Sequence, residues 1–419
     1  MRLVRLVGIF ALYAVGLSTS GWSQEAPLAL TLDQAKSRLL RENLTLLAEQ
    51  FSIANAEAEA IQARVWNNPN FVWNSDMYSV EKNQFMNYKN QVLIQLEMMV
   101  PVTGRFHKAG RVADLQVDVA KAEFANTLRE LLYSFTLEYN ALAVAQERSK
   151  LYQEVQALYD QLIVAAELNQ KVGALAGSEV LRLQSERLTV EAERMQNAQF
   201  IEASEARLKT LLYVEPKVRL QALLPSDVPA VLPPLGDLLA TMPANRGDYQ
   251  AAVTAVEMHR KNIALQKALA LGDVKLGYQP HDRGSNYVRP YQGIVVEIPL
   301  PTFDRNQGPT TIAENDYRRA QVELVQKENE MQNDLYSLYR QCVEVNRTFA
   351  GYSAERLNAV RTMNKNATEN YLKRHLSLLE YIDLQRIYKQ TLTDYLTVKQ
   401  NQLDAYASLL YATGQNTKP

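Results

Sequence analysis

The chain repeats itself at an offset of about 200 residues. The stretch QVLIQLEMMVPVTGRF, which begins at Gln91, aligns without a gap with YQGIVVEIPLPTFDRN, which begins at Tyr291, and Glu97 aligns with Glu297. In each copy, a short run of alternating apolar and polar residues ends at a proline and precedes a long helical pattern. Similarity at a fixed offset indicates that one structural unit was duplicated, so we expect a pseudo-symmetric fold. The function must be one that two similar halves can share.

The N-terminus has the pattern of a secretory signal peptide over residues 1–23. Arg2 and Arg5 form a basic region, an apolar run follows, and the small residues around Ser23 suit a cleavage site. The apolar run is too short to span a bilayer as a helix. Because no cysteine lies near the expected cleavage site, we expect an exported protein that is not a lipoprotein.

The composition argues against several classes of function. A formal net charge of -1, without a basic stripe, does not suit a nucleic-acid binder. The single cysteine, Cys342, excludes an internal disulfide framework. The four histidines are dispersed, and we find no nucleophile and base pair, phosphate-binding loop or clustered metal ligands. We therefore expect no enzyme activity, no catalytic residues, no cofactor and no dedicated metal site.

The chain divides into two repeats and a linker. Proline-free stretches after Pro101 and after Pro309 mark the long helices, because proline interrupts a helix. We expect a first repeat over 24–213, a proline-rich linker or equatorial belt over 214–245, and a second repeat over 246–419. The expected elements are leading helices over 31–65 and 247–271, β-hairpins at about 70–100 and 274–300, continuous rods that follow each hairpin, and returning helices over 178–212 and 378–411.

The rods carry a helix-packing pattern. In the second repeat, apolar residues recur at alternating spacings of four and three: Met331, Leu335, Leu338, Cys342, Val345, Phe349 and Tyr352. Such a heptad seam requires a neighbouring helix to receive its side chains, so Cys342 is expected in the core. The first repeat has a looser version within a rod over 112–168. Breakers at Val172–Leu175 and Lys373–His375 predict tight turns between antiparallel helices.

The strand before each proline has two different faces. Ile94, Leu96 and Met98 share an apolar face, and Gln95 and Glu97 lie on the other. This pattern is typical of a strand between lipid and a watery lumen. The alternative is the edge of a soluble sandwich.

Glu97 and Glu297 have two interpretations. They face the lumen, or they form structural ion pairs with Arg105 and Arg305 that follow in each repeat.

Four strands cannot close a barrel, and hydrocarbon does not tolerate an open sheet edge. If these strands lie in a membrane, several copies of the chain must supply the barrel jointly. Two copies would give eight strands and a filled interior, whereas three would give twelve and leave an open lumen.

The sequence resembles outer-membrane efflux proteins of the TolC family over nearly the whole mature chain. The residues that carry the resemblance are LTLDQAKSRLLRENLTL from Leu30, Asn67-Asn68-Pro69-Asn70, the duplicated hairpins and rods, and IPLPTFDRNQG from Ile298. The last segment is similar to the heavy-metal branch, of the cobalt, zinc, cadmium and copper kind.

The resemblance implies a mainly α fold with a small β part. It implies a homotrimer in which a twelve-stranded outer-membrane β-barrel, surrounded by lipid, continues into a twelve-helix periplasmic tunnel. It also implies passive conduction of substrates, heavy-metal cations or small toxic compounds, in partnership with a periplasmic adaptor and an inner-membrane proton-driven pump.

The resemblance further implies a gate at the periplasmic helix tips. Its acidic positions match Glu179, Glu380 and Asp383. Where relatives have an arginine before the second acidic pair, this chain has Leu376, with Arg374 two residues earlier. The alternative for the acids is an ordinary solvated helix end, where carboxylates suit the helix dipole.

The turns themselves would meet the adaptor, at Val172, Gly173, Arg374 and His375. Two other functions stay open: the exit duct of a protein secretion system, and a periplasmic coiled-coil adaptor or structural protein without a pore.

Overall fold

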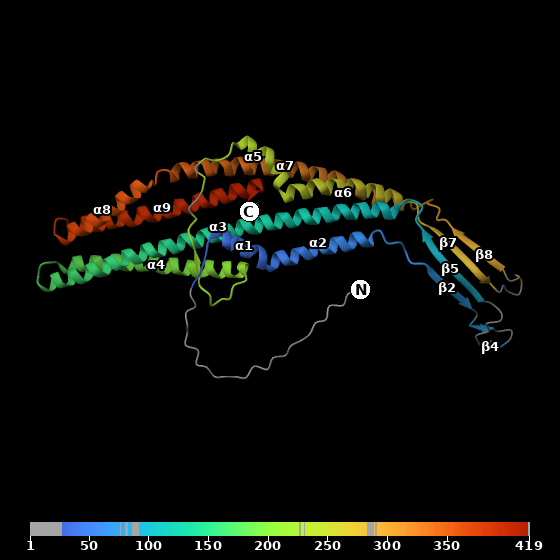
Figure 1. Ribbon diagram of the computed structural model, residues 1–419, viewed down its shortest axis with the longest axis horizontal. Helices are drawn as coiled ribbons and strands as arrows, with labels where there is room; N and C mark the ends of the chain where they lie inside the picture. The colour runs from blue at the N-terminus through green and yellow to red at the C-terminus, as the bar shows by residue number, and fades with distance from the viewer. Residues whose placement is uncertain are drawn as a thin grey trace.

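A computed structural model describes residues 27–75, 77–79, 83–85, 92–225, 228–229, 231–282, 289 and 291–417. The expected signal peptide, residues 1–23, lies outside the described residues. The molecule is elongated: a β-sheet occupies one end, and the turns of two helical hairpins occupy the other (Figure 1).

The first repeat differs from the sequence prediction in its leading helix. One helix was expected over 31–65, but α1 ends at Glu42 and α2 begins at Leu44. Asn43 separates them: its backbone is extended, its side chain accepts hydrogen bonds from the backbone N–H groups of Thr45 and Leu46, and its Nδ2 donates to the carbonyl of Leu211 at 3.0 Å. A capping side chain tied to another helix therefore overrides a continuous helical pattern. The elements are β1 (Leu28–Leu30), α1 (Leu32–Glu42), α2 (Leu44–Gln62), β2 (Asn70–Ser75), β3 (Tyr78–Ser79), β4 (Gln84–Phe85), β5 (Val92–Val100), α3 (Arg105–Lys171) and α4 (Gly177–Leu212).

The second repeat differs from the prediction in its rod. The rod was expected to be continuous, like the 67-residue α3, which is about 100 Å long. Instead α7 ends at Phe349, and Ser353 caps a new helix by accepting a hydrogen bond from the N–H of Arg356. The expected seam spans this break, where Phe349 and Tyr352 both contact Tyr395. The elements are α6 (Gly247–Leu269), β7 (Val274–Asp282), β8 (Tyr291–Glu297), α7 (Gln307–Phe349), α8 (Ala354–Leu372), α9 (Leu378–Thr413) and η1 (Gln415–Thr417). Among the described helices, none is both long enough and apolar enough to cross a membrane.

The linker contains regular structure that the sequence analysis did not predict. It holds β6 (Leu220–Ala222) and α5 (Leu235–Asn245), and β6 pairs in parallel with β1. The hydroxyl oxygen of Tyr139 on α3 lies 2.7 and 2.9 Å from the carbonyl oxygens of Leu30 and Leu223, which share its single hydrogen. The rod thus holds the N-terminal strand and the linker strand together at the middle of the molecule.

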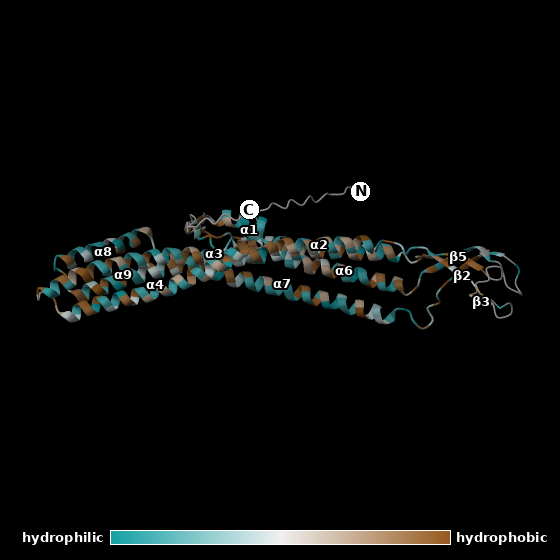
Figure 2. Ribbon diagram, turned by 90° about the horizontal axis from the view of Figure 1, so that it is seen from below, coloured by the Kyte–Doolittle hydropathy of each residue, from teal (hydrophilic) through white to brown (hydrophobic). Residues whose placement is uncertain are grey.

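The four longer strands form one antiparallel sheet in the order β2-β5-β7-β8. The strand before each proline has the two faces that the sequence predicted. One face of the sheet is apolar and exposed; its residues include Phe71, Trp73, Leu96, Leu276, Tyr278, Ile294 and Val296. In Figure 2 the hydrophobic colour follows much of β5. Gln95, Glu97, Lys275, Gln279 and Glu297 belong to the other face.

Helix α3 is the spine of the helical body and packs against α2, α4, α6 and α9. The contact with α6 is close at Gly247, where an added Cβ would lie 2.5 Å from the carbonyl oxygen of Ala122. Apolar clusters continue along the body. The cluster nearest the helical turns joins all four hairpin helices through residues such as Tyr159, Leu183, Ala367 and Tyr381.

A buried charge network joins α3, α6 and the end of α9. Asp248 accepts hydrogen bonds from Arg246 at 2.9 and 2.5 Å, and Arg129 lies 3.4 Å from the same carboxylate. The two arginines also donate to the carbonyls of Tyr411 and Ala412. Both cations therefore satisfy the last carbonyl groups of α9, where the helix dipole favours positive charge.

The network determines how Asp248 titrates. Burial by itself would raise the pKa of Asp248, but the hydrogen bonds and charge of Arg246, with the charge of Arg129, outweigh burial and lower the pKa below its ordinary value. A carboxyl whose pKa is lower in the folded state stabilises the fold above its unfolded-state pKa. That stability is lost as the pH falls through the folded-state value.

We predict that Asp248→Asn lowers the free energy of unfolding by on the order of 3 kcal/mol at pH 7, because it leaves two buried arginines without their carboxylate. The difference from the unsubstituted protein should shrink as the pH falls below about 4. Thermal unfolding followed by circular dichroism in detergent between pH 7 and pH 3 measures both effects. The exposed Asp237 supplies the control, since Asp237→Asn should change little. A difference that stays constant with pH would contradict this account.

Candidate functional site

The two helical turns at the tip have the same backbone hydrogen bonds. At the end of α3, the N–H of Gly173 donates to the carbonyl of Gln170, and the N–H of Ala174 donates to the carbonyl of Asn169. At the end of α8, the amides of Arg374 and His375 make the equivalent bonds to Tyr371 and Asn370. These bonds define the Schellman motif, whose central residue is left-handed, as Gly173 and Arg374 are, with φ values of 73° and 59°. The predicted breakers are confirmed as the tip turns.

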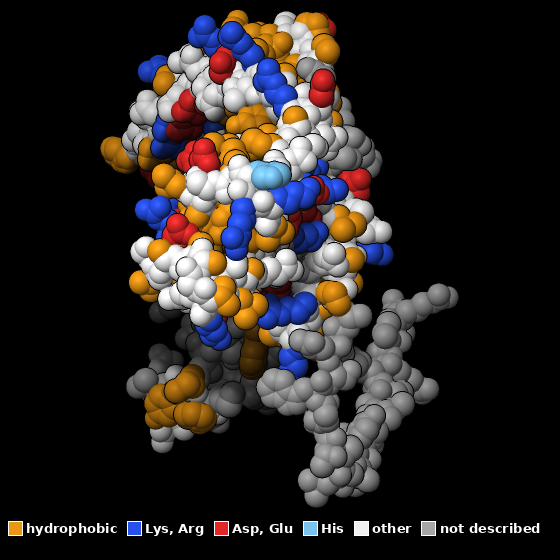
Figure 3. Space-filling view, turned by 90° about the vertical axis from the view of Figure 1, so that its left-hand side faces the viewer, with side chains coloured by type: hydrophobic (Ala, Val, Ile, Leu, Met, Phe, Trp, Pro, Cys, Tyr) orange, Lys and Arg blue, Asp and Glu red, His pale blue; other side chains and the backbone are white. Residues whose placement is uncertain are grey.

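Arg374 occupies a position that favours glycine. A side chain in the left-handed region costs roughly 1 kcal/mol or more, so the position is strained relative to Gly173. Its guanidinium Nη2 donates to Asn169 Oδ1 at 3.3 Å. Arg374 therefore links the turn of the second hairpin to the end of the first. Val172, Gly173, Arg374 and His375 are all exposed at this end, where Figure 3 shows acidic, basic and apolar side chains intermixed.

The structure places the three acidic residues in different surroundings. Glu380 completes a capping box: its carboxylate accepts from the N–H and hydroxyl of Ser377 at 3.0 and 2.6 Å. These hydrogen bonds lower the pKa of Glu380 below its usual value, and the bond from the Ser377 hydroxyl has the larger effect. Asp383 is exposed one turn further along α9. Glu179 lies in the first turn of α4. The pKa of the Tyr371 phenol is raised mainly by burial, and the nearby negative charge of Glu179 raises it further.

Side-chain bridges between the two hairpins went unrecognised in the sequence. Arg386 on α9 forms an ion pair with Glu186 on α4, and Lys389 Nζ lies 2.7 Å from Glu193. Tyr388 donates to Glu154 of α3 at 2.9 Å. The sequence signal would have been opposite charges on the two returning helices, but using it requires knowing that these helices face each other.

Of the two interpretations of Glu97 and Glu297, the one that paired them with Arg105 and Arg305 is wrong. Lys275 Nζ lies 3.2 Å from Glu97 and 3.0 Å from Glu297, whereas Arg105 pairs with Asp273. The reason is the sheet topology: β7 lies between β5 and β8, so its lysine reaches both carboxylates.

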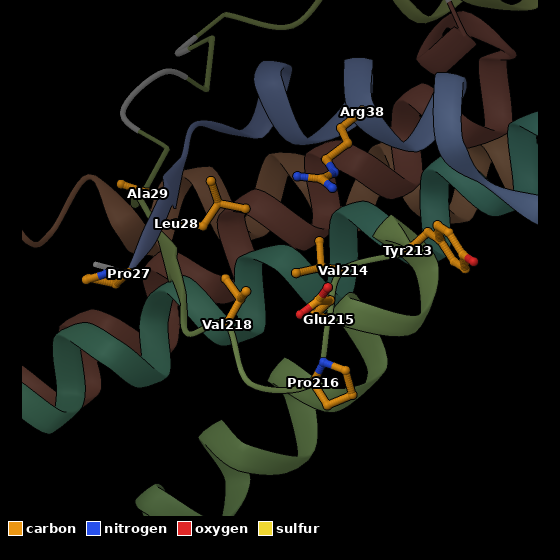
Figure 4. Close-up of a pocket in the computed structure, with 9 residues that line it drawn as sticks. All are labelled: Pro27, Leu28, Ala29, Arg38, Tyr213, Val214, Glu215, Pro216 and Val218. Carbon is orange, nitrogen blue, oxygen red and sulfur yellow. The ribbon is translucent and has the colours of Figure 1, made fainter. Parts of the chain in front are cut away.

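A surface pocket of about 790 Å³ lies beside β1 at the middle of the molecule (Figure 4). It is lined by Pro27, Leu28, Ala29, Arg38, Tyr213, Val214, Glu215, Pro216 and Val218. Arg38 and Glu215 are its only charged lining residues. In the part of the chain that the structure describes, no three His, Cys, Asp or Glu side chains are grouped so as to hold a metal ion.

Known proteins share this architecture. No protein-family model matches the chain. The chain is 24% identical over 402 residues to the cobalt-zinc-cadmium resistance protein CzcC of Cupriavidus metallidurans, with 92% of each chain covered. Among solved structures, it superposes on CusC with a TM-score of 0.73 at 15% identity, covering 94% of each chain. It superposes on the Campylobacter jejuni CmeC outer membrane channel with a TM-score of 0.74 at 12% identity, covering 98% of this chain and 94% of CmeC.

The chain has the fold of the TolC-family outer-membrane efflux channels. The resemblance inferred from the sequence, including the similarity to the heavy-metal branch, is confirmed. CmeC is itself an outer membrane channel.

The tip turns give a direct test of the strain at Arg374. We predict that Arg374→Gly slows hydrogen exchange of the amides around residues 371–376, because glycine removes a cost of ~1 kcal/mol from the left-handed position. Gly173→Ala should accelerate exchange at the first turn for the opposite reason. Asn169→Ala removes the side-chain bond without changing the backbone preference, and serves as the control. Both variants lose the side-chain bond, so faster exchange in Arg374→Gly than in Asn169→Ala would contradict the strain at position 374.

Proposed function

We propose that three copies of this chain form the outer-membrane exit duct of a tripartite efflux pump. The duct passively conducts substrates from the periplasm to the outside, and it catalyses no reaction. The observation that carries the proposal is a four-stranded sheet with an exposed apolar face and two edge strands, at one end of a long pair of helical hairpins.

The edges of the sheet support assembly from several copies. In the described sheet, β2 and β8 are the outer strands, and they carry exposed apolar side chains such as Trp73 and Val296. Unpaired strand edges in hydrocarbon cost several kcal/mol for each unsatisfied group. Joining β8 of one copy to β2 of the next satisfies both edges. Three copies give a twelve-stranded barrel with an open lumen.

The helices support the same arrangement. Within the chain, α6 packs against both α3 and α7. By the repeat symmetry, α2 is the counterpart of α6 and packs against α3, leaving Leu47 and Phe51 exposed. Helix α7 exposes Val322 and Val325. An α2 helix that packs against α7 of a neighbouring copy would bury both sets and repeat the contact found within one chain.

The repeat also predicts the register between copies. Leu96 on β5 pairs with Tyr278 on β7. Val296 corresponds to Leu96 in the other repeat. Trp73 pairs with Ile94 as Tyr278 pairs with Ile294, so Trp73 corresponds to Tyr278. We therefore propose that Val296 of one copy lies opposite Trp73 of the next.

The partners follow from the two ends of the duct. The tip turns at Val172 to Gly173 and Arg374 to His375 would dock a periplasmic adaptor, which connects the duct to an inner-membrane proton-driven pump. The similarity to CzcC supports heavy-metal cations as cargo. Glu97 and Glu297, on the polar face of the sheet, would line the lumen.

The gate lies at the same tips. Three copies would bring Glu179, Glu380 and Asp383 into rings around the aperture, where carboxylates attract cations and repel one another. Arg374 would restrain the second hairpin through Asn169. Opening the aperture requires the hairpins of each chain to separate.

We predict that Glu380→Gln combined with Asp383→Asn changes the channel conductance in planar bilayers by about twofold or more, in the direction of a wider open aperture. Glutamine at position 380 can keep the capping box, so the helix start should be preserved. The capping change Ser377→Ala, which leaves both charges in place, is the matched control. If the double variant has the same conductance as the unsubstituted protein, these acids do not form the gate. If neither the unsubstituted protein nor any of the variants passes current, the proposed duct itself is contradicted.

A further inference from the structure

Five polar side chains form a continuous chain of contacts across the polar face of the sheet. Lys275 bridges the two carboxylates at 3.2 and 3.0 Å. Gln95 Nε2 donates to Glu97 Oε1 at 2.6 Å, and Gln279 Nε2 donates to Gln95 Oε1 at 2.9 Å. We call Gln95, Glu97, Lys275, Gln279 and Glu297 the polar collar. It lies toward the end of the sheet that joins the helices, since Glu297 ends β8 and Lys275 is the second residue of β7.

Two glycines make room for the collar. An added Cβ at Gly277 would lie 2.7 Å from Gln95 Nε2, and one at Gly293 would lie 3.0 Å from Gln279 Oε1. Both glutamine side chains can therefore lie across neighbouring strands instead of projecting away from the sheet. Gln95 and Gln279 are 6% and 9% exposed within a single chain. The collar is thus held in place by the chain's own contacts before any assembly.

The collar is unequal between the repeats. Lys275 pairs with Glu297 across β7 and β8, whereas the corresponding position opposite Glu97 is Asn70. Only the second repeat therefore supplies a cation, and the collar has two carboxylates for one ammonium group. The adjacent Arg105 is balanced by Asp273 at 2.5 Å, so it does not offset the excess.

We propose that the collar sets the charge selectivity of the pore, and that Lys275 determines how strongly cations are favoured. The inference rests on the proposed function, because the polar face must line a water-filled lumen. Repeated around a closed barrel, the collar is a ring with net negative charge next to a low-dielectric wall, which concentrates cations and excludes anions. Lys275 limits that charge, so that hydrated cations are attracted without being held by bare carboxylates.

The test is the reversal potential of the reconstituted protein in a planar bilayer under a KCl gradient. Lys275→Met should raise the K⁺/Cl⁻ permeability ratio by roughly threefold, because each chain gains one uncompensated negative charge. The double variant Glu97→Gln with Glu297→Gln should lower the ratio to about one or below. Both shifts should diminish as the salt rises from 0.1 to 1 M, since the screening length falls from about 10 to about 3 Å.

Lys150→Met is the matched control. Lys150 pairs with Glu147 on α3. The neighbouring Gln146 binds the linker strand β6 at the middle of the molecule, away from the sheet. Loss of Lys150 should therefore not change the K⁺/Cl⁻ permeability ratio. Lys275→Gln keeps a hydrogen-bonding side chain and should reproduce the rise if Lys275→Met inserts poorly. Current with an unchanged ratio in the Lys275 and Glu97/Glu297 variants would overturn the collar's role alone. A protein that inserts but passes no current would overturn the proposed function and the collar's role with it.

Discussion

The unsatisfied edges of the sheet are the constraint on which the rest of the structure depends. Strands β2 and β8 present backbone groups and apolar side chains that one chain does not cover in the described structure. In a bilayer, such edges are stable only when another strand pairs with them. The helices continue from the same strands, so the arrangement that closes the sheet also determines how the helices of different copies meet. The exposed apolar residues of α2 and α7 fit this requirement.

Duplication gives the molecule its symmetry, and its specific properties lie where the two repeats differ. Helix α3 is continuous, whereas its counterpart is divided into α7 and α8. The turn that uses Gly173 in one hairpin uses Arg374 in the other, and only Arg374 can reach Asn169. On the sheet, Lys275 replaces the asparagine of the first repeat. These differences concern the tips and the polar face of the sheet, which are the two parts that we propose to control passage.

Local patterns in the sequence predicted most elements, because helices, strands and tight turns follow from the spacing of apolar residues and from glycine and proline. The two faces of the strand before each proline and the turns at Gly173 and Arg374 were recognised in this way. Features that depend on contacts between distant segments were not. The break at Asn43 depends on a bond to Leu211, and the pairing of β1 with β6 joins segments far apart in the chain. The partners of Glu97 and Glu297 could not be predicted without knowing that β7 lies between them.

The central claim, that neighbouring copies complete the sheet, is tested most directly by cross-linking the two edges. In a Cys342→Ser background, Trp73→Cys with Val296→Cys should give covalent dimers and trimers, and nothing larger, when membranes are treated with a short thiol-reactive cross-linker. The pair Trp73→Cys with Val295→Cys places the thiols on opposite faces and should cross-link poorly. Monomers alone from the first pair, or equal yields from both pairs, would contradict the account.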